Sequence, residues 1–324
     1  MNNGFFFLKY AEARPPAVQP SPMSVLVSGT VAYDDIAAPG GSGENLLGGS
    51  ASYAAIAAAL FAPTHLAGIV GDDFAERDRE RLRRRGVDLG SLATVTGGET
   101  FRWRGRYHED FNSRDTLETR LGVNALPRPP LSAEARRAPF VLLANDAPGL
   151  QLDVRAQLLA PRFVVADSMN LWIETARDDL LRVVQRTSLL VLNDSEARQF
   201  TGEQNLITAG RRLLELGPVA VIIKKGEHGA LLFHYKGGLF ALPAYPVEDV
   251  LDPTGAGDSF AGALTGVLAA LKRTDFTALR LAMLYATAVA SVTVESLSCD
   301  RLEITTPKEI EDRAERLRSI TTIS

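Results

Sequence analysis

One short glycine-rich segment carries the residues best suited to chemistry. It consists of Gly255, Ala256, Gly257 and Asp258. Apolar residues at helical spacing follow as far as Leu271, so the glycine turn is expected to open a helix. Free backbone N–H groups at a helix start carry partial positive charge, and glycine lets a phosphate approach them closely. A carboxylate would repel phosphate there, so Asp258 needs a second role, and accepting the proton of an attacking hydroxyl fits it.

The same segment has a plainer interpretation as an ordinary helix start, because glycine and aspartate both favour such positions. The sequence contains neither the Gly-x-Gly-x-x-Gly fingerprint of dinucleotide-binding folds nor the Gly-x-x-x-x-Gly-Lys-Ser/Thr loop of P-loop proteins. A Gly-x-Gly pair alone is weak evidence. The catalytic interpretation therefore depends on partners elsewhere in the chain.

Polar residues follow two of the apolar runs that look like buried strands. Asn193 and Glu196 stand after one of them, and by themselves they are equally a helix cap with a glutamate in the first turn. Asp167, Asn170 and Trp172 stand after another. Open α/β sheets bind ligands at their strand ends, so we expect Asp167, Asn170 and Trp172 to line the substrate pocket.

The elements that position these residues follow a simple order. Short β-branched runs alternate with longer helical stretches, which predicts an α/β fold with a doubly wound, mainly parallel sheet and helices on both faces. The expected strands are 25–27, 66–70, 141–143, 163–165, 189–192 and 219–223. The expected helices include 50–61, 74–85, 174–186 and 206–216.

The segment from about 96 to 121 departs from this alternation. Its residues 101–108 alternate one by one, which is a strand pattern. The even positions are Arg102, Arg104, Arg106 and His108, and the aromatic odd positions are Phe101, Trp103 and Tyr107. Two interpretations of the basic face stay open. It is either a solvated surface or subunit contact, or a lid surface on which Arg106 meets an anionic substrate or phosphates.

Size and composition narrow the functional classes. The chain has 324 residues, 46% of them hydrophobic, which is enough for a core of ordinary size. A net charge of -4 gives no basis for nonspecific binding to nucleic acid or to an anionic membrane, so a small-molecule partner is expected. The single cysteine, Cys299, excludes an internal disulfide and fits a cytoplasmic location. The proline-rich residues 1–22 are expected to be a disordered extension.

Two segments resemble the signatures of the ribokinase-like (PfkB) family of carbohydrate kinases. Residues 252–260, Asp-Pro-Thr-Gly-Ala-Gly-Asp-Ser-Phe, are similar to the family's C-terminal motif. Residues 48–57, Gly-Gly-Ser-Ala-Ser-Tyr-Ala-Ala-Ile-Ala, resemble its N-terminal substrate-binding motif. The two occur in the family's order and at a large separation. Together with the alternating architecture, the resemblance extends from residue 24 to about residue 317.

The resemblance implies one ribokinase-like kinase domain over residues 23–324. It adds a small β lid, with strands expected from about 30–45 and 96–121. The implied reaction is phosphorylation by MgATP of a hydroxyl on a sugar, nucleoside or related compound. A homodimer through the lid is the protein partner that we expect.

The resemblance also assigns roles in the catalytic centre. Asp258 corresponds to the family's general base, and the amides of residues 255–257 to its anion hole. Asp34, or the adjacent Asp35, corresponds to the aspartate that holds substrate hydroxyls. A carboxylate that accepts two vicinal hydroxyls suits a polyol.

Further matches concern the nucleotide and its metal ions. Asn193 and Glu196 resemble the family's Asn-x-x-Glu motif, which acts around magnesium and the ATP phosphates, with Glu196 reaching Mg2+ through water. Gly226 and Gly229 resemble a turn that keeps the backbone close to ATP, and Lys224, or the lysine after it, would neutralise phosphate charge.

A second cation site is also implied. Asp252 and Thr254 lie where some family members bind a monovalent cation through side-chain and backbone oxygens. The resemblance therefore adds K+ to ATP and Mg2+ as an expected cofactor.

The substrate-binding motif departs from that of sugar kinases. Gly48 and Gly49 match it, but Tyr53 stands where those enzymes often carry asparagine. Two roles for Tyr53 stay open, stacking on a base or sugar face and packing in the helix core. A sugar or sugar-like acceptor is the leading hypothesis, and a nucleoside of the adenosine type is the alternative. A catalytically idle ligand-binding protein on the same fold is a third, against which intact Asp258 and Glu196 argue.

Overall fold

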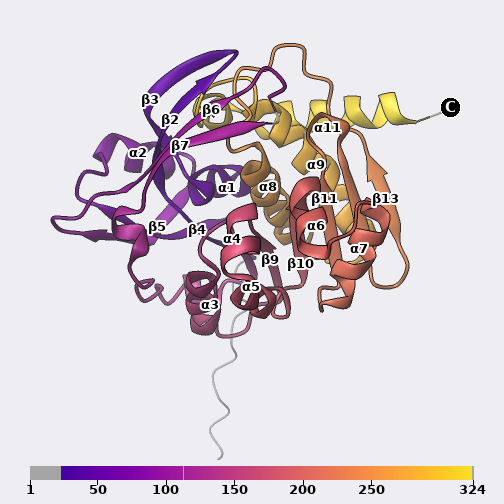
Figure 1. The fold of residues 1–324 in the computed structure, drawn as a ribbon, viewed down its shortest axis with the longest axis horizontal. Coiled ribbons are helices and arrows are strands. Elements are labelled where there is room, and N and C mark those ends of the chain that lie inside the picture. Colours follow the sequence, from indigo (N-terminus) through magenta and orange to yellow (C-terminus); the bar gives the residue numbers. More distant parts are fainter. Residues whose placement is uncertain (1–22, 112, 323–324) are drawn as a thin grey trace, which may run out of the picture.

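The computed structural model describes residues 23–111 and 113–322, so the extension predicted over residues 1–22 lies outside it. Within the described residues, the strands form a sheet of nine strands and a sheet of four (Figure 1). The larger contains β1 (Val25–Ser28), β4 (Thr64–Gly71), β5 (Val87–Val95), β8 (Phe140–Leu143), β9 (Phe163–Asp167), β10 (Leu189–Asn193), β11 (Ala220–Lys224), β12 (Ala230–His234) and β13 (Leu239–Leu242). The smaller contains β2 (Ala32–Ala38), β3 (Gly41–Gly48), β6 (Phe101–Tyr107) and β7 (Arg114–Arg120).

The helices fill the connections between these strands. They are α1 (Ser50–Ala59), α2 (Glu76–Arg84), α3 (Pro148–Gln157), α4 (Asn170–Thr175), α5 (Arg177–Val184), α6 (Asp194–Thr201), α7 (Leu206–Glu215), α8 (Ala256–Leu271), α9 (Phe276–Thr293), α10 (Asp300–Ile304) and α11 (Pro307–Thr321). Each of the strands and helices expected from the sequence overlaps one of these elements.

The large sheet is doubly wound and mainly parallel, as predicted. Its order is β13-β12-β11-β10-β9-β8-β1-β4-β5, and only β12 and β13 run antiparallel to their neighbours. Buried residues of its strands divide between two apolar clusters, one on each face, which is why β1 is apolar at every position from Val25 to Val27. The chain order reverses between β1 and β8. Ligands of such sheets bind beyond the carboxyl ends of the strands at this point.

Close packing of α1 on α8 sets the position of two helix starts. A Cβ atom at Gly262 would lie 2.1 Å from the Ala54 carbonyl oxygen, and one at Gly266 would lie 2.7 Å from that of Ala58. Glycine at these two positions therefore lets the helices approach closely. As a result the segments around Gly49 and Gly255, which open α1 and α8, converge at the same end of the large sheet.

The four-stranded sheet, in the order β3-β2-β6-β7, forms a lid at that end of the molecule (Figure 1). Strand β2 pairs with β6 in parallel, and β3 and β7 pair antiparallel on either side. This sheet carries Asp34 on β2 and the arginine row on β6.

Helix α9 is the one described helix that is long and apolar enough to cross a membrane by length and composition. Of its apolar window, 67% is buried inside the fold. That burial is typical of a core helix, and α9 belongs to the apolar cluster that also contains α1 and α8.

Candidate active site

The glycine loop opens α8 in a conformation suited to an anion. Gly255 is left-handed, with φ of 77°, and the amide of Ala256 donates to the Pro253 carbonyl oxygen at 3.2 Å. Within the described residues, no backbone or side-chain oxygen accepts from the amides of Gly257 and Asp258. These two N–H groups are therefore available to a phosphate.

Asp258 follows these amides in the first turn of α8. Burial raises the pKa of its carboxyl group to about 6, the charge of Asp167 adds to this, and Lys224 and Arg114 oppose it. A carboxylate with this pKa is mostly ionised at neutral pH, yet it binds a proton more readily than an ordinary aspartate. Both properties suit a general base.

A lysine ammonium lies beside the loop. A Cβ atom at Gly257 would be 2.9 Å from the Nζ atom of Lys224, and this Nζ lies 3.3 Å from Oδ2 of Asp167. Burial alone would lower the pKa of Lys224, but the carboxylates of Asp167, Glu196 and Asp258 outweigh it and raise that pKa. The ammonium therefore stays charged at the place where the free amides point.

Asn193 and Glu196 form a reciprocal helix cap at the start of α6. The amide of Glu196 donates to Asn193 Oδ1 at 2.8 Å, and the amide and side chain of Asn193 donate to the two Glu196 carboxylate oxygens at 2.7 and 2.6 Å. Burial raises the pKa of Glu196 to about 7. Both oxygens are engaged in this cap, and contact of Glu196 with magnesium through a water molecule, a usual arrangement for this ion, stays a prediction.

Asp252 is a buried carboxylate next to Thr254. Its Oδ1 accepts the amide of Thr254 at 2.9 Å, whereas Oδ2 and the Thr254 hydroxyl have no hydrogen-bond partner among the described residues. Burial raises the pKa of Asp252. Two unpartnered oxygens beside an enclosed carboxylate fit the predicted monovalent cation.

The structure separates Asp34 from Asp35. Asp34 is buried against the start of α1, where a Cβ atom at Gly48 would lie 2.0 Å from its Oδ2. Burial raises the pKa of Asp34 to about 7, the Gly49 amide opposes the rise, and the charges of Asp252 and Asp258 add to it. Asp34 is thus the member of the pair that lies near the catalytic loop.

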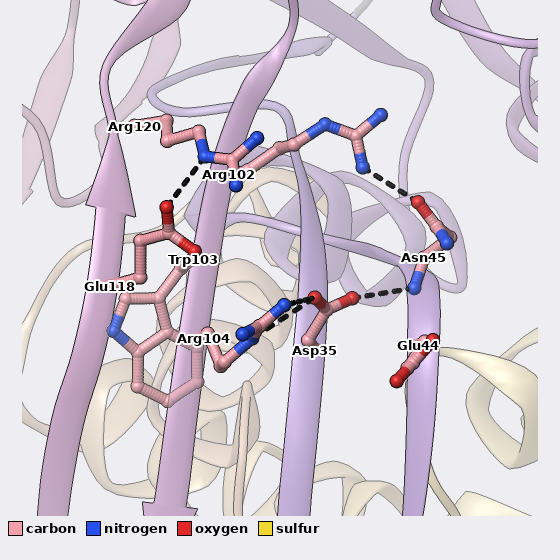
Figure 2. A pocket seen from close by; sticks show the side chains of 8 residues that line it. All are labelled: Asp35, Glu44, Asn45, Arg102, Trp103, Arg104, Glu118 and Arg120. Atoms are coloured by element: carbon pink, nitrogen blue, oxygen red, sulfur yellow. Dashed lines mark hydrogen bonds and ion pairs between the residues drawn. The ribbon is translucent and has the colours of Figure 1, made fainter.

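The side chain of Asp35 lies on the opposite face of the lid. Its carboxylate binds Arg104 at 3.2 Å and accepts the Asn45 amide at 2.8 Å (Figure 2). Arg102 on the same face donates to Asn45 at 2.6 Å and to Asp73 at 3.1 Å.

The pairing of β2 with β6 corrects the prediction for Arg106. In this register Asp35 pairs with Arg104 and Ala37 with Arg106, so Arg106 belongs to the outer face. It is exposed there. The basic row therefore faces away from Asp34, because residues that alternate along a strand point to opposite sides.

The other face of β6 is turned toward the site. Trp103 is paired directly with Asp34, and its indole lies along Gly105, where a Cβ atom would be 2.0 Å from the ring. Tyr107 extends the same row, lies close to Thr254 and is paired with Arg114 on β7.

Arg114 and Trp103 are site residues that the sequence analysis did not identify. The charge of Arg114 lowers the pKa of both Asp258 and Glu196, which places its guanidinium near the two carboxylates. One lid arginine is not distinguishable from the next in the sequence. The one available signal was the row of aromatic residues at odd positions of β6. This row predicts that the residues share a face, but it does not predict which part of the molecule that face meets.

Tyr53 is a packing residue, one of the two roles left open for it, and Asp167 lies at the end of β9, as predicted. The side chain of Tyr53 is enclosed, with 1% of the residue exposed, and its ring packs under Gly255, where a Cβ atom would lie 2.3 Å away. It supports the loop instead of stacking on a substrate. The side chain of Asp167 is 5% exposed and is engaged by Lys224.

Polar side chains also lie just after the ends of β8 and β9. Asn145, just after β8, accepts from the indole nitrogen of Trp172 at 3.1 Å and donates to the sulfur of Met169 at 3.3 Å. Asn170, by contrast, is exposed and donates to Gln199 at 2.8 Å. Asn145 and Trp172 are therefore hydrogen-bonded to each other at this end of the sheet.

The turn predicted to contact the nucleotide follows β11. Gly226 and Gly229 both have positive φ, of 55° and 78°. A Cβ atom at Gly229 would lie 2.0 Å from the Leu242 carbonyl oxygen, so packing against β13 requires this glycine. The contact of either residue with ATP stays a prediction.

Free amides at a helix start, an adjacent carboxylate and a fixed ammonium, placed under a lid at the switch point of an α/β sheet, define a phosphotransferase. Comparison with known proteins gives the family. Residues 156–306 match the model of the pfkB family carbohydrate kinases. The cytidine kinase of Thermococcus kodakarensis is 32% identical over 257 residues, which cover 78% of this chain and 89% of that protein. The chain therefore belongs to the PfkB family, as its motifs predicted.

Solved structures agree in fold. A nucleoside kinase of Methanocaldococcus jannaschii, described as an archaeal member of the ribokinase family, gives a TM-score of 0.73 at 20% identity and covers 91% of this chain and 98% of its own. The aminoimidazole riboside kinase of Salmonella enterica, solved with aminoimidazole riboside and an ATP analogue, gives a TM-score of 0.71 at 22% identity. This match covers 90% of this chain and 99% of that one. The predicted ribokinase-like fold is confirmed, and the chain is a sugar or nucleoside kinase.

Proposed function

We propose that this protein transfers the γ-phosphoryl group of ATP to a ribose hydroxyl of a nucleoside. The observation that carries the choice of acceptor is the direct pairing of Trp103 with Asp34 on the site-facing side of the lid. One residue offers a flat aromatic surface for a base, and the other offers a carboxylate for the vicinal hydroxyls of ribose. Stacking of a base on an aromatic side chain contributes about 1 to 3 kcal/mol.

The similarity to a cytidine kinase supports this acceptor over a free sugar, which was the leading expectation from the sequence. A free sugar would fill the space at Asp34 without using the indole of Trp103, whose nitrogen donates to Thr116 Oγ1 at 3.2 Å and whose ring lies 5.8 Å from the guanidinium carbon of Arg114. The half-exposed Trp172 and the amide of Asn145 lie at the strand ends nearby, where a base could find both an apolar surface and a hydrogen-bond donor.

In the proposed reaction Asp34 orients the acceptor and Asp258 removes its proton. The hydroxyl oxygen forms a bond to the γ-phosphorus as the bond between that phosphorus and the bridging oxygen of ADP breaks. The amides of Gly257 and Asp258, together with the Lys224 ammonium, stabilise the charge on the transferred group.

Two metal ions complete the proposal. Magnesium bound to ATP neutralises phosphate charge, and Glu196 would reach it through water. A monovalent cation such as K+ would be held by Asp252 and Thr254, whose unpartnered oxygens fit it.

A panel of acceptors tests the proposal. Purified protein is incubated with MgATP in K+ buffer, and ADP release is measured with cytidine, uridine, adenosine, inosine, ribose and fructose. Release that depends on a nucleoside, and that free ribose does not reproduce, is the expected result. Turnover of a free sugar with none of any nucleoside would replace the nucleoside with a sugar acceptor, and no turnover at all would favour an idle binding protein.

A homodimer through the lid stays part of the proposal. The outer face carries both positive and negative side chains, among them Arg102, Arg104 and Asp35 (Figure 2). These charges would complement those of a second copy of the chain. Sedimentation of the protein before and after replacement of Arg104 by glutamate tests it, and an unchanged monomer in both cases would remove the dimer.

A further inference from the structure

We propose that Asp167 is a positioning residue that holds the Lys224 ammonium beside Gly257, where the transferred phosphoryl group binds. This inference rests on the proposed phosphoryl transfer. It replaces the expectation that Asp167 contacts the acceptor. It also gives a reason for the unusual enclosure of a carboxylate and an ammonium at neighbouring strand ends.

The pair is built from two strands that do not touch each other. Asp167 ends β9 and Lys224 ends β11, with β10 between them. Their Oδ2 and Nζ atoms are 3.3 Å apart, and 5% and 18% of the two side chains are exposed. The lysine side chain therefore crosses the end of β10 to meet the carboxylate, instead of extending into solvent.

The orientation of Asp167 is fixed on its other side. Its Oδ1 accepts the amide of Ser168 at 2.9 Å, and its carbonyl oxygen accepts the side-chain amide of Gln151 at 3.0 Å. Only Oδ2 is left for the lysine. The carboxylate is thus held in one position before any ligand arrives.

The other end of the contact is the glycine loop. A Cβ atom at Gly257 would lie 2.9 Å from Lys224 Nζ, closer than such atoms approach in folded proteins. The ammonium consequently lies directly beside the free amides. A lysine side chain is flexible and its ammonium is strongly hydrated, so a fixed anchor is needed to keep it in one place.

Other charged groups face the same ammonium. Glu196 on α6 and Asp258 on α8 attract Lys224, and Arg114 on β7 lies near both of these carboxylates. Without the charge of Asp167, the ammonium would be free to pair with Asp258 and neutralise the proposed base. Asp167 accordingly has two effects through Lys224: it keeps a cation at the phosphate and keeps that cation off the base.

Stability alone does not account for the pair. Removing an ammonium and a carboxylate from water costs more than their attraction commonly returns, and apolar residues of similar volume often serve a fold as well. A pair that is enclosed, fixed on its acid side and aimed at the anion site is better explained by ligand binding.

The test is a double-mutant cycle with Asp167→Asn and Lys224→Met. Asparagine keeps the Oδ1 acceptor for Ser168 and replaces the charged Oδ2 acceptor that faces the lysine with a neutral NH2 group. We expect Asp167→Asn to lower kcat/KM for ATP by about 10- to 100-fold, the range for losing a charge-assisted contact. The KM for the nucleoside should change by no more than about twofold. Lys224→Met should cost ~100-fold or more, and the double variant no more than Lys224→Met alone.

Controls separate this role from a general loss of fold. Asp179→Asn removes an exposed aspartate of α5 that pairs with Arg182, and it should leave all constants unchanged. Asp167→Glu keeps the charge and should recover part of the activity that Asp167→Asn loses. Melting temperatures with and without an ATP analogue are measured for each variant.

Three outcomes overturn the inference. One is a rise in the KM for the nucleoside with the kinetic constants for ATP unchanged, which would indicate that Asp167 contacts the acceptor. Another is a double variant whose loss is the product of the single losses, which makes the residues independent. The third is equal inactivity of Asp167→Glu and Asp167→Asn with lowered melting temperatures, which makes the role structural. A wild-type protein without nucleoside-dependent ADP release refutes the proposed function instead.

Discussion

Replacing Gly257 with alanine is expected to slow phosphoryl transfer without weakening the fold. The residue lies in the first turn of α8 and has an ordinary helical backbone, since it is absent from the described residues with positive φ. Alanine is therefore accommodated by the backbone, and it gains up to about 1 kcal/mol in helix propensity over glycine. Apart from its chain neighbours and its own helix backbone, the only atoms of the described residues within 4 Å of this methyl group are Nζ and Cε of Lys224, at 2.9 and 3.8 Å.

The substitution is expected to lower turnover, because it changes the position at which the phosphate binds. The end of a lysine side chain moves easily, so the methyl group should displace the ammonium from the loop and also obstruct the approach of a phosphate to the Gly257 amide. Loss of one such stabilising group reduces turnover by about 100-fold or more. We therefore expect kcat to fall by about that factor while the melting temperature stays constant or rises by about 1 to 3 °C.

Thermal unfolding and steady-state ADP release on the same preparation measure both quantities. Gly149→Ala is the matched control, because Gly149 is in the first turn of α3 and also has ordinary φ. Beyond its chain neighbours and its own helix backbone, the described residues have no atom within 4 Å of the added Cβ position. It should show a similar gain in stability with unchanged activity. Wild-type turnover in Gly257→Ala, or a melting temperature several degrees lower, would refute the placement of Lys224 beside the loop.

The remaining expectations concern the base, the lid and the cations. Asp258→Asn should reduce kcat at least ~100-fold with ATP binding intact, as measured by titration of an ATP analogue. Because the pKa of Asp258 is raised to about 6 and the base must be ionised, kcat should fall as the pH is lowered through about 6, and a limb near the ordinary aspartate pKa would contradict this. Arg114→Ala should raise the KM for ATP by about 10-fold, whereas Arg120→Ala on the outer face should not change it. Asp252→Ala should abolish any activation of the enzyme by K+ over a bulky organic cation, and persistent activation would place the cation elsewhere.

Much of the fold could be predicted because its central strands are buried on both faces. Such strands are continuous apolar runs, as at Val25 to Val27 and Val221 to Ile223, and the helices between them have amphipathic spacing. The glycine loop could also be predicted, because the positive φ of Gly255 favours glycine. These constraints are local, so they are visible in consecutive residues.

What could not be predicted depends on partners distant in the sequence. Alternation along β6 predicts two faces, but only the register with β2 decides which of them meets Asp34, and of the two interpretations left open for the basic face this register does not support the one in which Arg106 meets substrate. Tyr53 has the residue type of a stacking platform, yet the crossing of α1 and α8 places its ring under Gly255. Asp167 was correctly placed at a strand end, but its lysine partner follows 57 residues later.

Detection of the phosphorylated product tests the central claim most directly. The wild-type protein and Asp258→Asn are incubated in parallel with MgATP and cytidine, and the mixtures are analysed by mass spectrometry for cytidine monophosphate. The expected result is formation of the monophosphate by the wild type and at least ~100-fold less by the variant, both proteins being folded and able to bind ATP. Equal product from the two proteins would contradict the role of Asp258, and the absence of phosphorylated product with every nucleoside would contradict the proposed acceptor.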